Sequence, residues 1–213
     1  MVILDAHTHQ IKKGGVVNLD YSNQSDIDKV DYFSRGIHPW LLSKDNEIER
    51  LLMEVEKISI CSKLVAIGET GLDKLSARYE DQITLFHAHL DIAKKIKKPI
   101  IVHCVKSQND ILRALKYKKF NQKMMIHGFN GSREEAFNVI KNGHYIGVGP
   151  QLFSNFKINK YLHELPVEHL LLETDESDLD AKVILEKMSI HLNKNKHDLA
   201  DMLNENFKLF FCL

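Results

Sequence analysis

The sequence predicts an α/β protein, a compact (β/α)₈ barrel of the TIM type that forms a single domain over residues 1–213. Short apolar runs recur along the chain, amphipathic helical stretches lie between most of them, and several runs end in a histidine or an acidic residue. Strands that are apolar on both faces and alternate with helices are typical of a parallel sheet covered by helices.

The apolar runs are the predicted strands. They cover residues 2–7, 15–20, 32–38, 64–69, 99–104, 123–129, 144–149 and 169–175. Eight such runs suit a closed barrel, although such barrels typically need about 250 residues. This chain is shorter than that. We expect the missing residues to be in the first βα units, because the spacing of the first strands leaves little room for helices between them. A doubly wound open sheet is the alternative, but no G-x-G-x-x-G fingerprint supports it.

Helical periodicity predicts the covering layer. Residues 79–98 carry one apolar stripe, formed by Ile83, Phe86, Leu90, Ala93 and Ile96. Residues 132–143 begin with a capping box, Ser132 with Glu135, and end at Gly143. The last predicted helix, residues 197–211, has a buried face of Leu199, Met202, Leu203, Phe207 and Phe210.

The string Asp-Ala-His-Thr-His at residues 5–9 predicts a metal site. In a strand, His7 and His9 point to the same face, whereas in a helix side chains two residues apart diverge by about 200°. The apolar run before them favours a strand, so the two rings are predicted to hold one ion. His87 and His89 repeat the spacing inside a predicted helix, where we expect them at the surface or in helix packing.

Potential metal ligands end five of the predicted strands. They are His7, His9, Glu69, His103, His127 and Asp175. The carboxyl ends of barrel strands meet at one face, where catalytic residues gather. Six ligands exceed the need of one tetrahedral ion and suit two divalent ions about 3.5–4 Å apart. We therefore expect two divalent ions, and the ligand types are compatible with zinc, manganese, magnesium or a similar metal.

Composition excludes several other classes. Lysine plus arginine and aspartate plus glutamate number 29 each, so the chain has no overall attraction to nucleic acid or membrane. Cys61, Cys104 and Cys212 are odd in number and widely spaced, which predicts a reducing, cytoplasmic setting. The chain shows no signal-peptide pattern or long apolar segment, so no membrane association is expected. No obligate protein partner is evident.

Several strings occur in the order found in one known family. They are His-Thr-His (7–9), Gly-Ile-His-Pro (36–39), Ile-Gly-Glu-Thr-Gly-Leu-Asp (67–73), Val-His (102–103), Ile-His-Gly-Phe-Asn-Gly-Ser (126–132) and Leu-Leu-Leu-Glu-Thr-Asp (170–175). The chain thus resembles the TatD family of metal-dependent hydrolases, which are amidohydrolase-like barrels, and residues 204–211 resemble that family's closing helix. The resemblance implies a TIM-type barrel that binds two divalent metals and hydrolyses phosphodiesters, typically as a deoxyribonuclease.

The resemblance also implies roles for single residues. By position, His7, His9, Glu69 and Asp175 would hold one ion, and Glu69 would bridge to a second ion. His103 and His127 would complete the second site. His38 would lie at the edge of the site, contacting substrate or a metal ligand.

The chain departs from the family pattern at substrate-contacting positions, as in a compact variant. Where the family usually reads His-x-Arg, this chain has Val105 followed by Lys106, and Lys106 becomes a candidate substrate contact. The loops after residues 127 and 175 also differ from the family pattern. Basic residues are sparse in the loops after the strands, so we expect a phosphodiester substrate such as short or single-stranded DNA ends.

Two carboxylates are predicted to act in catalysis. Asp175 would accept the proton of a water activated by two ions, and Glu69 would bridge those ions. Glu173 shares the face of Asp175 and is expected to accept a hydrogen bond from a ligand histidine. The alternatives are a hydrolase of small (phospho)esters or amides, and a metal-binding barrel without catalysis.

Overall fold

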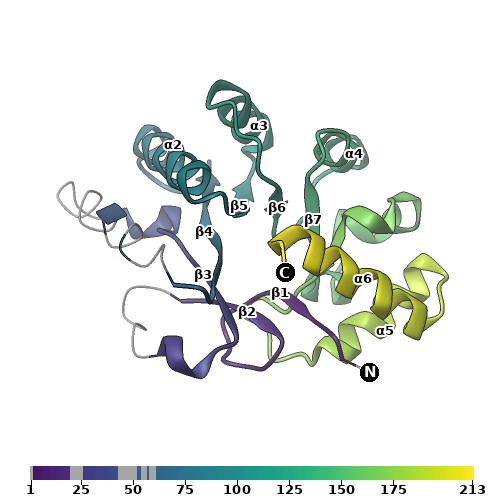
Figure 1. The fold of residues 1–213 in the computed structure, drawn as a ribbon. Helices are drawn as coiled ribbons and strands as arrows, with labels where there is room; N and C mark the ends of the chain where they lie inside the picture. The colour runs from purple at the N-terminus through teal and green to yellow at the C-terminus, as the bar shows by residue number, and fades with distance from the viewer. Residues whose placement is uncertain (1, 20–25, 43–51, 54–56, 58–60) are drawn as a thin grey trace.

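The strands of the chain form one parallel barrel. The computed structural model describes residues 2–19, 26–42, 52–53, 57 and 61–213. Within them, eight strands pair in sequence order, and every neighbouring pair is parallel. They are β1 (Asp5–Thr8), β2 (Gly15–Asn18), β3 (Tyr32–Arg35), β4 (Leu64–Asp73), β5 (Ile100–Val105), β6 (Met124–Ile126), β7 (Tyr145–Val148) and β8 (Leu170–Leu172). A parallel bridge between Thr8 and Asp175 brings the two ends of the sheet together. The predicted barrel is therefore confirmed, as a nearly closed ring (Figure 1).

Helices cover the later strands on the outside of the ring (Figure 1). They are α2 (Tyr79–Ile96), α3 (Gln108–Tyr117), α4 (Arg133–Lys141), α5 (Ala181–Leu192) and α6 (Lys196–Phe211). The three helices predicted from periodicity correspond to α2, α4 and α6. The capping box of Ser132 and Glu135 is present, and Gly143 follows α4 with φ +78°, a conformation that favours glycine.

The first βα units are shortened, as expected. Residues 9–14 join β1 to β2 without a helix, and residues 26–29 form a single 3₁₀ segment before β3. After β3 comes another short 3₁₀ turn, η2 (Pro39–Leu41). The chain therefore reaches its third strand by residue 32.

The helix α6 closes one end of the barrel. Its phenylalanines pack against a layer of strand residues that comprises Ala6, Val16, Val65, Ala66, Ile101, Met125, Tyr145 and Leu171. The Asn204 Oδ1 accepts the backbone N–H of Leu4 at 2.9 Å, and the Asn206 side chain donates to the carbonyls of Val167 and Leu170 at 2.7 and 2.9 Å. These bonds tie α6 to the chain entering β1 and β8. Of its predicted buried face, Met202 is only half-buried, whereas Phe211 is fully buried.

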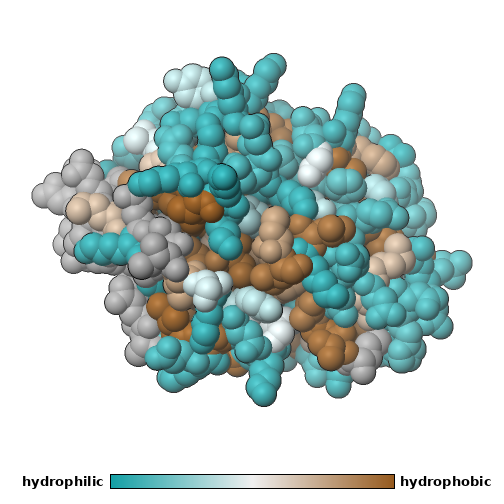
Figure 2. Space-filling view, viewed as in Figure 1, coloured by the Kyte–Doolittle hydropathy of each residue, from teal (hydrophilic) through white to brown (hydrophobic). Residues whose placement is uncertain are grey.

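The surface over this closed end is mostly hydrophilic. Figure 2 shows a polar rim around smaller apolar patches, in the same view as Figure 1. The exposed apolar residues at the end of α6 are Leu209 and Leu213, each 51% exposed. Among the described residues, no helix has the length and apolar character needed to cross a membrane.

Candidate metal centre

Four side chains at the open end of the barrel form a tight group. The Nε2 atoms of His7 and His9 each lie 3.5 Å from the Glu69 Oε2. The same nitrogens lie 3.5 and 3.6 Å from the Asp175 Oδ1. Ligands placed tetrahedrally about 2.1 Å from an ion are about 3.4 Å apart. These distances are close to that spacing. His7, His9 and Glu69 form one group that could hold a divalent ion, and His7, His127 and Asp175 form another.

A second group faces the other oxygen of Glu69. The Glu69 Oε1 lies 2.7 Å from the Nε2 of His127 and 3.2 Å from the Nδ1 of His103. These two ring nitrogens are 3.4 Å apart. One carboxylate thus separates two groups of potential ligands, with one oxygen toward each. The six predicted ligands are all brought together.

Several buried ring nitrogens in this site lie near carboxylates but make no hydrogen bond. Both nitrogens of His7, the Nε2 of His103 and the Nδ1 of His127 are buried without a hydrogen bond. Buried polar atoms in native proteins are nearly always satisfied. Imidazole and carboxylate donors together suit divalent zinc, manganese, cobalt or iron. The residues present therefore fit a divalent metal.

The electrostatics of the site favour bound positive charge. Burial raises the pKa of Glu69, but the charge of His127 and hydrogen bonds with His103, His127 and His38 hold this pKa well below its usual range. Burial lowers the pKa of His7, but the adjacent carboxylates of Asp175 and Glu69 raise it to about 10. Without metal, protons on the imidazoles thus neutralise the ionised carboxylates. Metal binding would displace such protons.

Extra residues in two strands aim the ligands. Asp5 pairs with Gly15 and Thr8 pairs with Val17, so β1 holds one more residue than β2 in this span. Likewise β4 holds one more residue than β5 between Ile67 and Thr70. Such bulges redirect side chains beside active sites. They lie at His7 and at Glu69, and regular alternation along the sequence does not predict them.

Two glycines of the Ile-Gly-Glu-Thr-Gly-Leu-Asp string allow β4 to approach β5. Gly68 and Gly71 have φ of +142° and +150°. A Cβ on Gly68 would lie 2.5 Å from the Ile101 carbonyl oxygen, and one on Gly71 would lie 2.0 Å from that of His103. No other residue fits at these two positions, which flank Glu69.

Hydrogen bonds join the segment after β8 to β1. The Asp5 carboxylate accepts hydrogen bonds from the backbone N–H of His7 at 3.2 Å and from the N–H and hydroxyl of Thr174 at 3.1 and 2.7 Å. Thr174, the residue before Asp175, is therefore tied to β1. Asp175 follows with φ +53°, a region that aspartate tolerates better than most residues.

Glu173 is fully buried beside the site. Burial raises its pKa to about 7. Its Oε1 accepts the backbone N–H of Gly128 at 2.5 Å, and its Oε2 has no partner among the described residues. A hydrogen bond from Glu173 to a ligand histidine, as expected from the sequence, is not among the described contacts. Glu173 instead fixes the backbone directly after His127.

His38 contacts Glu69 from the rim. Its Nδ1 accepts the backbone N–H of Trp40 at 3.2 Å, so the neutral ring carries its proton on Nε2. The His38 Nε2 lies 3.2 Å from the Glu69 Oε1 and can donate to it. His38 thus reaches the oxygen that His103 and His127 face, and together with Glu69 and His103 it forms a group that could itself hold a metal ion.

Lys106 is exposed at the end of β5. It lines a separate cavity of about 390 Å³, together with Gly128, Asn130 and Lys157. Several other loop cations are engaged elsewhere: Lys12 with Asp5, Lys74 and Arg113 with Asp110, and Arg133 with Glu164. For Lys106 no ion pair is described, which leaves it suited to a substrate contact.

Sequence reasoning missed several supporting residues. Asn18 accepts the backbone N–H of Glu69 at 3.0 Å, and Asp73 accepts the Trp40 indole N–H at 2.7 Å. Asp5 and Asp73 lie within the quoted strings, yet their roles depend on partners distant in sequence. His89 is fully buried and accepts the backbone N–H of Ile37, the residue before His38, at 3.0 Å. No local pattern indicates these contacts.

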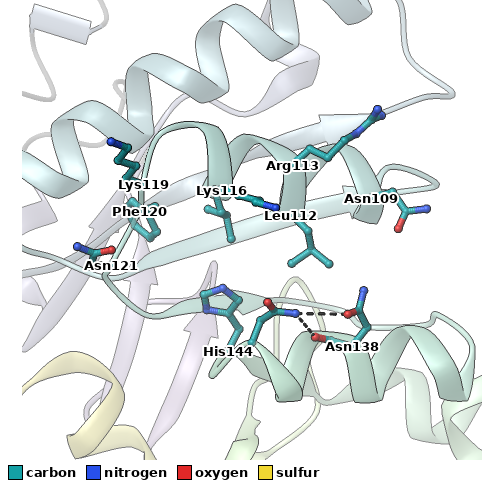
Figure 3. A pocket seen from close by; sticks show the side chains of 11 residues that line it. Asn109, Leu112, Arg113, Lys116, Lys119, Phe120, Asn121, Asn138 and His144 are labelled. Atoms are coloured by element: carbon teal, nitrogen blue, oxygen red, sulfur yellow. Dashed lines mark hydrogen bonds between the residues drawn. The ribbon is translucent and has the colours of Figure 1, made fainter.

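The site opens into a cavity of about 360 Å³. Its walls include His9, His38, Trp40, Leu41, His103 and Glu176. A larger groove of about 830 Å³ runs between α3 and α4 on the outside of the barrel (Figure 3). That groove presents asparagines, Arg113, Lys116 and Lys119, and none of the ligand groups found among the described residues lies in it. The candidate metal ligands therefore line the smaller cavity.

Curated relatives of the chain are metal-dependent hydrolases. An uncharacterized metal-dependent hydrolase of Buchnera aphidicola subsp. Acyrthosiphon pisum is 29% identical, over 99% of this chain and 90% of that protein. The uncharacterized metal-dependent hydrolase YjjV of Escherichia coli K12 is 32% identical, over 70% of this chain and 59% of that protein. The second match thus covers less than two thirds of its relative.

Solved structures share the fold. The crystal structure of YjjV, a TatD homolog from Escherichia coli K12, superposes with a TM-score of 0.83 at 23% identity, over 93% of this chain and 86% of that one. An Escherichia coli phosphotriesterase homology protein, complexed with phosphate in its active site, gives 0.69 at 14% identity, over 92% of this chain and 82% of that one. The family model for TatD-related DNase matches residues 18–212. The chain therefore belongs to the TatD family of metal-dependent hydrolases.

Proposed function

We propose that this hydrolase is a phosphodiesterase of the deoxyribonuclease type that uses two divalent ions. The observation that carries the proposal is the position of Glu69, whose oxygens face separate ligand groups at 3.5 Å and at 2.7–3.2 Å. A bridging carboxylate between ions about 3.5–4 Å apart is the arrangement of two-metal phosphoryl chemistry. Asp175, His7 and His9 complete one ion site, and His103 and His127 complete the other.

The chain's own residues supply the remaining chemistry. Bound divalent ions lower the pKa of coordinated water and neutralise charge on a phosphoryl oxygen. Burial raises the pKa of Asp175, but its hydrogen bond with His7 and the charges of His127 and His7 hold this pKa below its usual value. Asp175 is therefore ionised, and at 32% side-chain exposure it reaches the cavity. It accepts the proton from the attacking water and returns it to the leaving oxygen.

The cavity and its charges suggest the substrate. At about 360 Å³ it accommodates one phosphodiester linkage and its neighbouring groups rather than a long duplex. Lys106 and Lys157 line a separate cavity that also includes Gly128, the residue after His127, and they are candidate phosphate contacts. A short or single-stranded DNA end is the substrate that this arrangement favours, because a small basic footprint holds few phosphates.

The experiment combines metal content with cleavage. The protein is purified without chelator, its metal is measured by elemental analysis, and cleavage of a labelled single-stranded oligonucleotide is followed. We expect about two ions per chain and cleavage that is lost in Glu69→Gln. Glu176→Gln is the matched control, because Glu176 is a carboxylate in the same cavity that belongs to no ligand group.

Each other outcome contradicts a defined part of the proposal. Two ions without oligonucleotide cleavage would overturn the deoxyribonuclease assignment, and turnover of small phosphoesters or amides by the same preparation would support the small-molecule alternative. Two ions without any turnover would indicate a non-catalytic barrel. No bound metal after addition of manganese or zinc would overturn the metal centre itself.

A further inference from the structure

An aromatic side chain stands at the mouth of the metal-ligand cavity. Trp40 lines this cavity and is 64% exposed. Its ring centroid lies 4.7 Å from that of His38 and 5.4 Å from that of His103, with nearly perpendicular planes. The indole is therefore one ring away from side chains that contact Glu69. A lone exposed apolar residue is common on protein surfaces, so exposure by itself assigns no role.

The distinguishing feature is that this exposed ring is held in place. The indole N–H donates to the Asp73 Oδ2 at 2.7 Å. Asp73 is only 4% exposed, and its Oδ1 accepts the backbone N–H of Leu75 at 2.8 Å. The acceptor is thus a buried carboxylate that two hydrogen bonds hold in place.

The backbone at Trp40 is held as well. Pro39 precedes it in η2 and restricts its own φ to a narrow range. The backbone N–H of Trp40 donates to the His38 Nδ1 at 3.2 Å. Both ends of the residue are therefore fixed before any ligand arrives, which reduces the entropy lost when a flat ligand packs on the ring.

We propose that Trp40 is a stacking platform for a nucleobase attached to the scissile phosphodiester. This inference rests on the proposed function and specifies its substrate as base-bearing. Base stacking on an aromatic ring tolerates every base because each has a π-face. Stacking suits a site where few cations are available for phosphate, because it adds binding affinity that does not depend on phosphate contacts. The platform selects nucleotides over phosphodiesters that lack a flat group.

The first test is kinetic. We expect Trp40→Ala to raise KM for the oligonucleotide about 10-fold or more with little change in kcat, because stacking is present in both ground state and transition state. Trp40→Phe, which keeps a ring, retains most of the affinity. With an abasic nucleotide at the cleaved end, wild type and Trp40→Ala should become equal. The control is Tyr117→Ala, which removes an aromatic ring that is 75% exposed on α3.

The second test needs neither turnover nor a variant. Trp40 is the only tryptophan in the chain, so indole fluorescence reports on this position alone. Titration of the metal-loaded wild type with a nucleoside monophosphate should quench this fluorescence to saturation. A sugar phosphate without a base should leave it nearly unchanged.

The outcomes separate this inference from the proposed function. If intact and abasic oligonucleotides are cleaved alike and neither probe quenches selectively, the platform is wrong while the phosphodiesterase stands. If the nucleotide quenches selectively but no oligonucleotide is cleaved, the platform stands and the proposed deoxyribonuclease activity fails. Equal quenching by both probes contradicts the platform.

Discussion

Two histidine pairs with the same spacing lie in different secondary structures in this molecule and make different contacts. His7 and His9 lie on β1 and its end, and both Nε2 atoms reach the same Glu69 oxygen at 3.5 Å. His87 and His89 lie in α2 and diverge. His87 is half-buried and stacks on Tyr117, whereas His89 is fully buried and bonds to Ile37 and Leu85. The spacing alone carries no chemistry, because the backbone period decides whether two side chains share a face.

The two histidine pairs also differ in what they contribute to the site. The pair on β1 faces ionised carboxylates at the open end of the barrel. His89, by contrast, holds the backbone before His38 and serves the site at a distance. Variants of the two pairs should therefore fail in different ways.

The largest effect is expected in the strand pair. His9→Asn should remove one ion per chain and slow cleavage on the order of 10³-fold, because one ion contributes several kcal/mol to the transition state. Metal analysis and single-turnover cleavage measure the two effects, with His87→Asn as the matched control. Full activity and full metal content in His9→Asn would contradict a metal-binding role for the β1 pair, since the two pairs would then behave alike.

Acid should destabilise the protein through His89. Burial lowers its pKa from 6.5 to about 4, so the unfolded chain takes up a proton at a higher pH than the folded one. The contribution of His89 to stability is therefore constant above pH 6.5 and falls as the pH drops toward 4, by at most about 3 kcal/mol. Denaturant unfolding across this range measures the slope.

The matched variant for that measurement is His89→Gln, which keeps an acceptor for Ile37 and cannot titrate. It should flatten part of the slope. His144 contributes to the slope in the same direction, because burial and the nearby His169 also lower its pKa to about 4. An unchanged slope in His89→Gln would show that His89 is not held neutral in the fold.

A moderate effect is expected at Asp5, which supports the strand pair without facing the ions. Asp5→Ala removes the acceptor for the His7 and Thr174 backbone N–H groups, so the two ligand-bearing segments lose their alignment. We expect metal affinity to fall about 10–100-fold, as is typical when support of a ligand is lost. Calorimetric titration with zinc measures it. Unchanged affinity would mean that the bulge in β1 holds His7 without Asp5.

The smallest effect is expected at His87. His87→Ala should change the free energy of unfolding by less than about 0.5 kcal/mol and leave metal content and cleavage intact. A loss of metal in this variant would contradict the interpretation of the second pair as helix packing.

The sequence predicted most of the architecture. The eight strands, the helices α2, α4 and α6 and the shortened first units are all present, because hydrophobic periodicity and capping are local signals. The convergence of His7, Glu69 and Asp175 followed from one topological rule, that parallel strands end at the same face.

The parts that were not predicted depend on contacts across the barrel. The bulge that places Glu69 is visible only in the pairing of β4 with β5. The hydrogen bonds of Trp40 to Asp73 and of His89 to Ile37 join residues 33 and 52 positions apart. Neither periodicity nor composition encodes such partners. The sequence therefore predicted the metal ligands but not the contacts that support them.

Under the proposed function, the Glu69 carboxylate would join two metal ions. Anomalous diffraction from crystals loaded with manganese would locate them. We predict two anomalous peaks about 3.5–4 Å apart, one on each side of the Glu69 carboxylate, with His7 and His9 at one and His103 and His127 at the other. A single peak, or two peaks that Glu69 does not join, would contradict it.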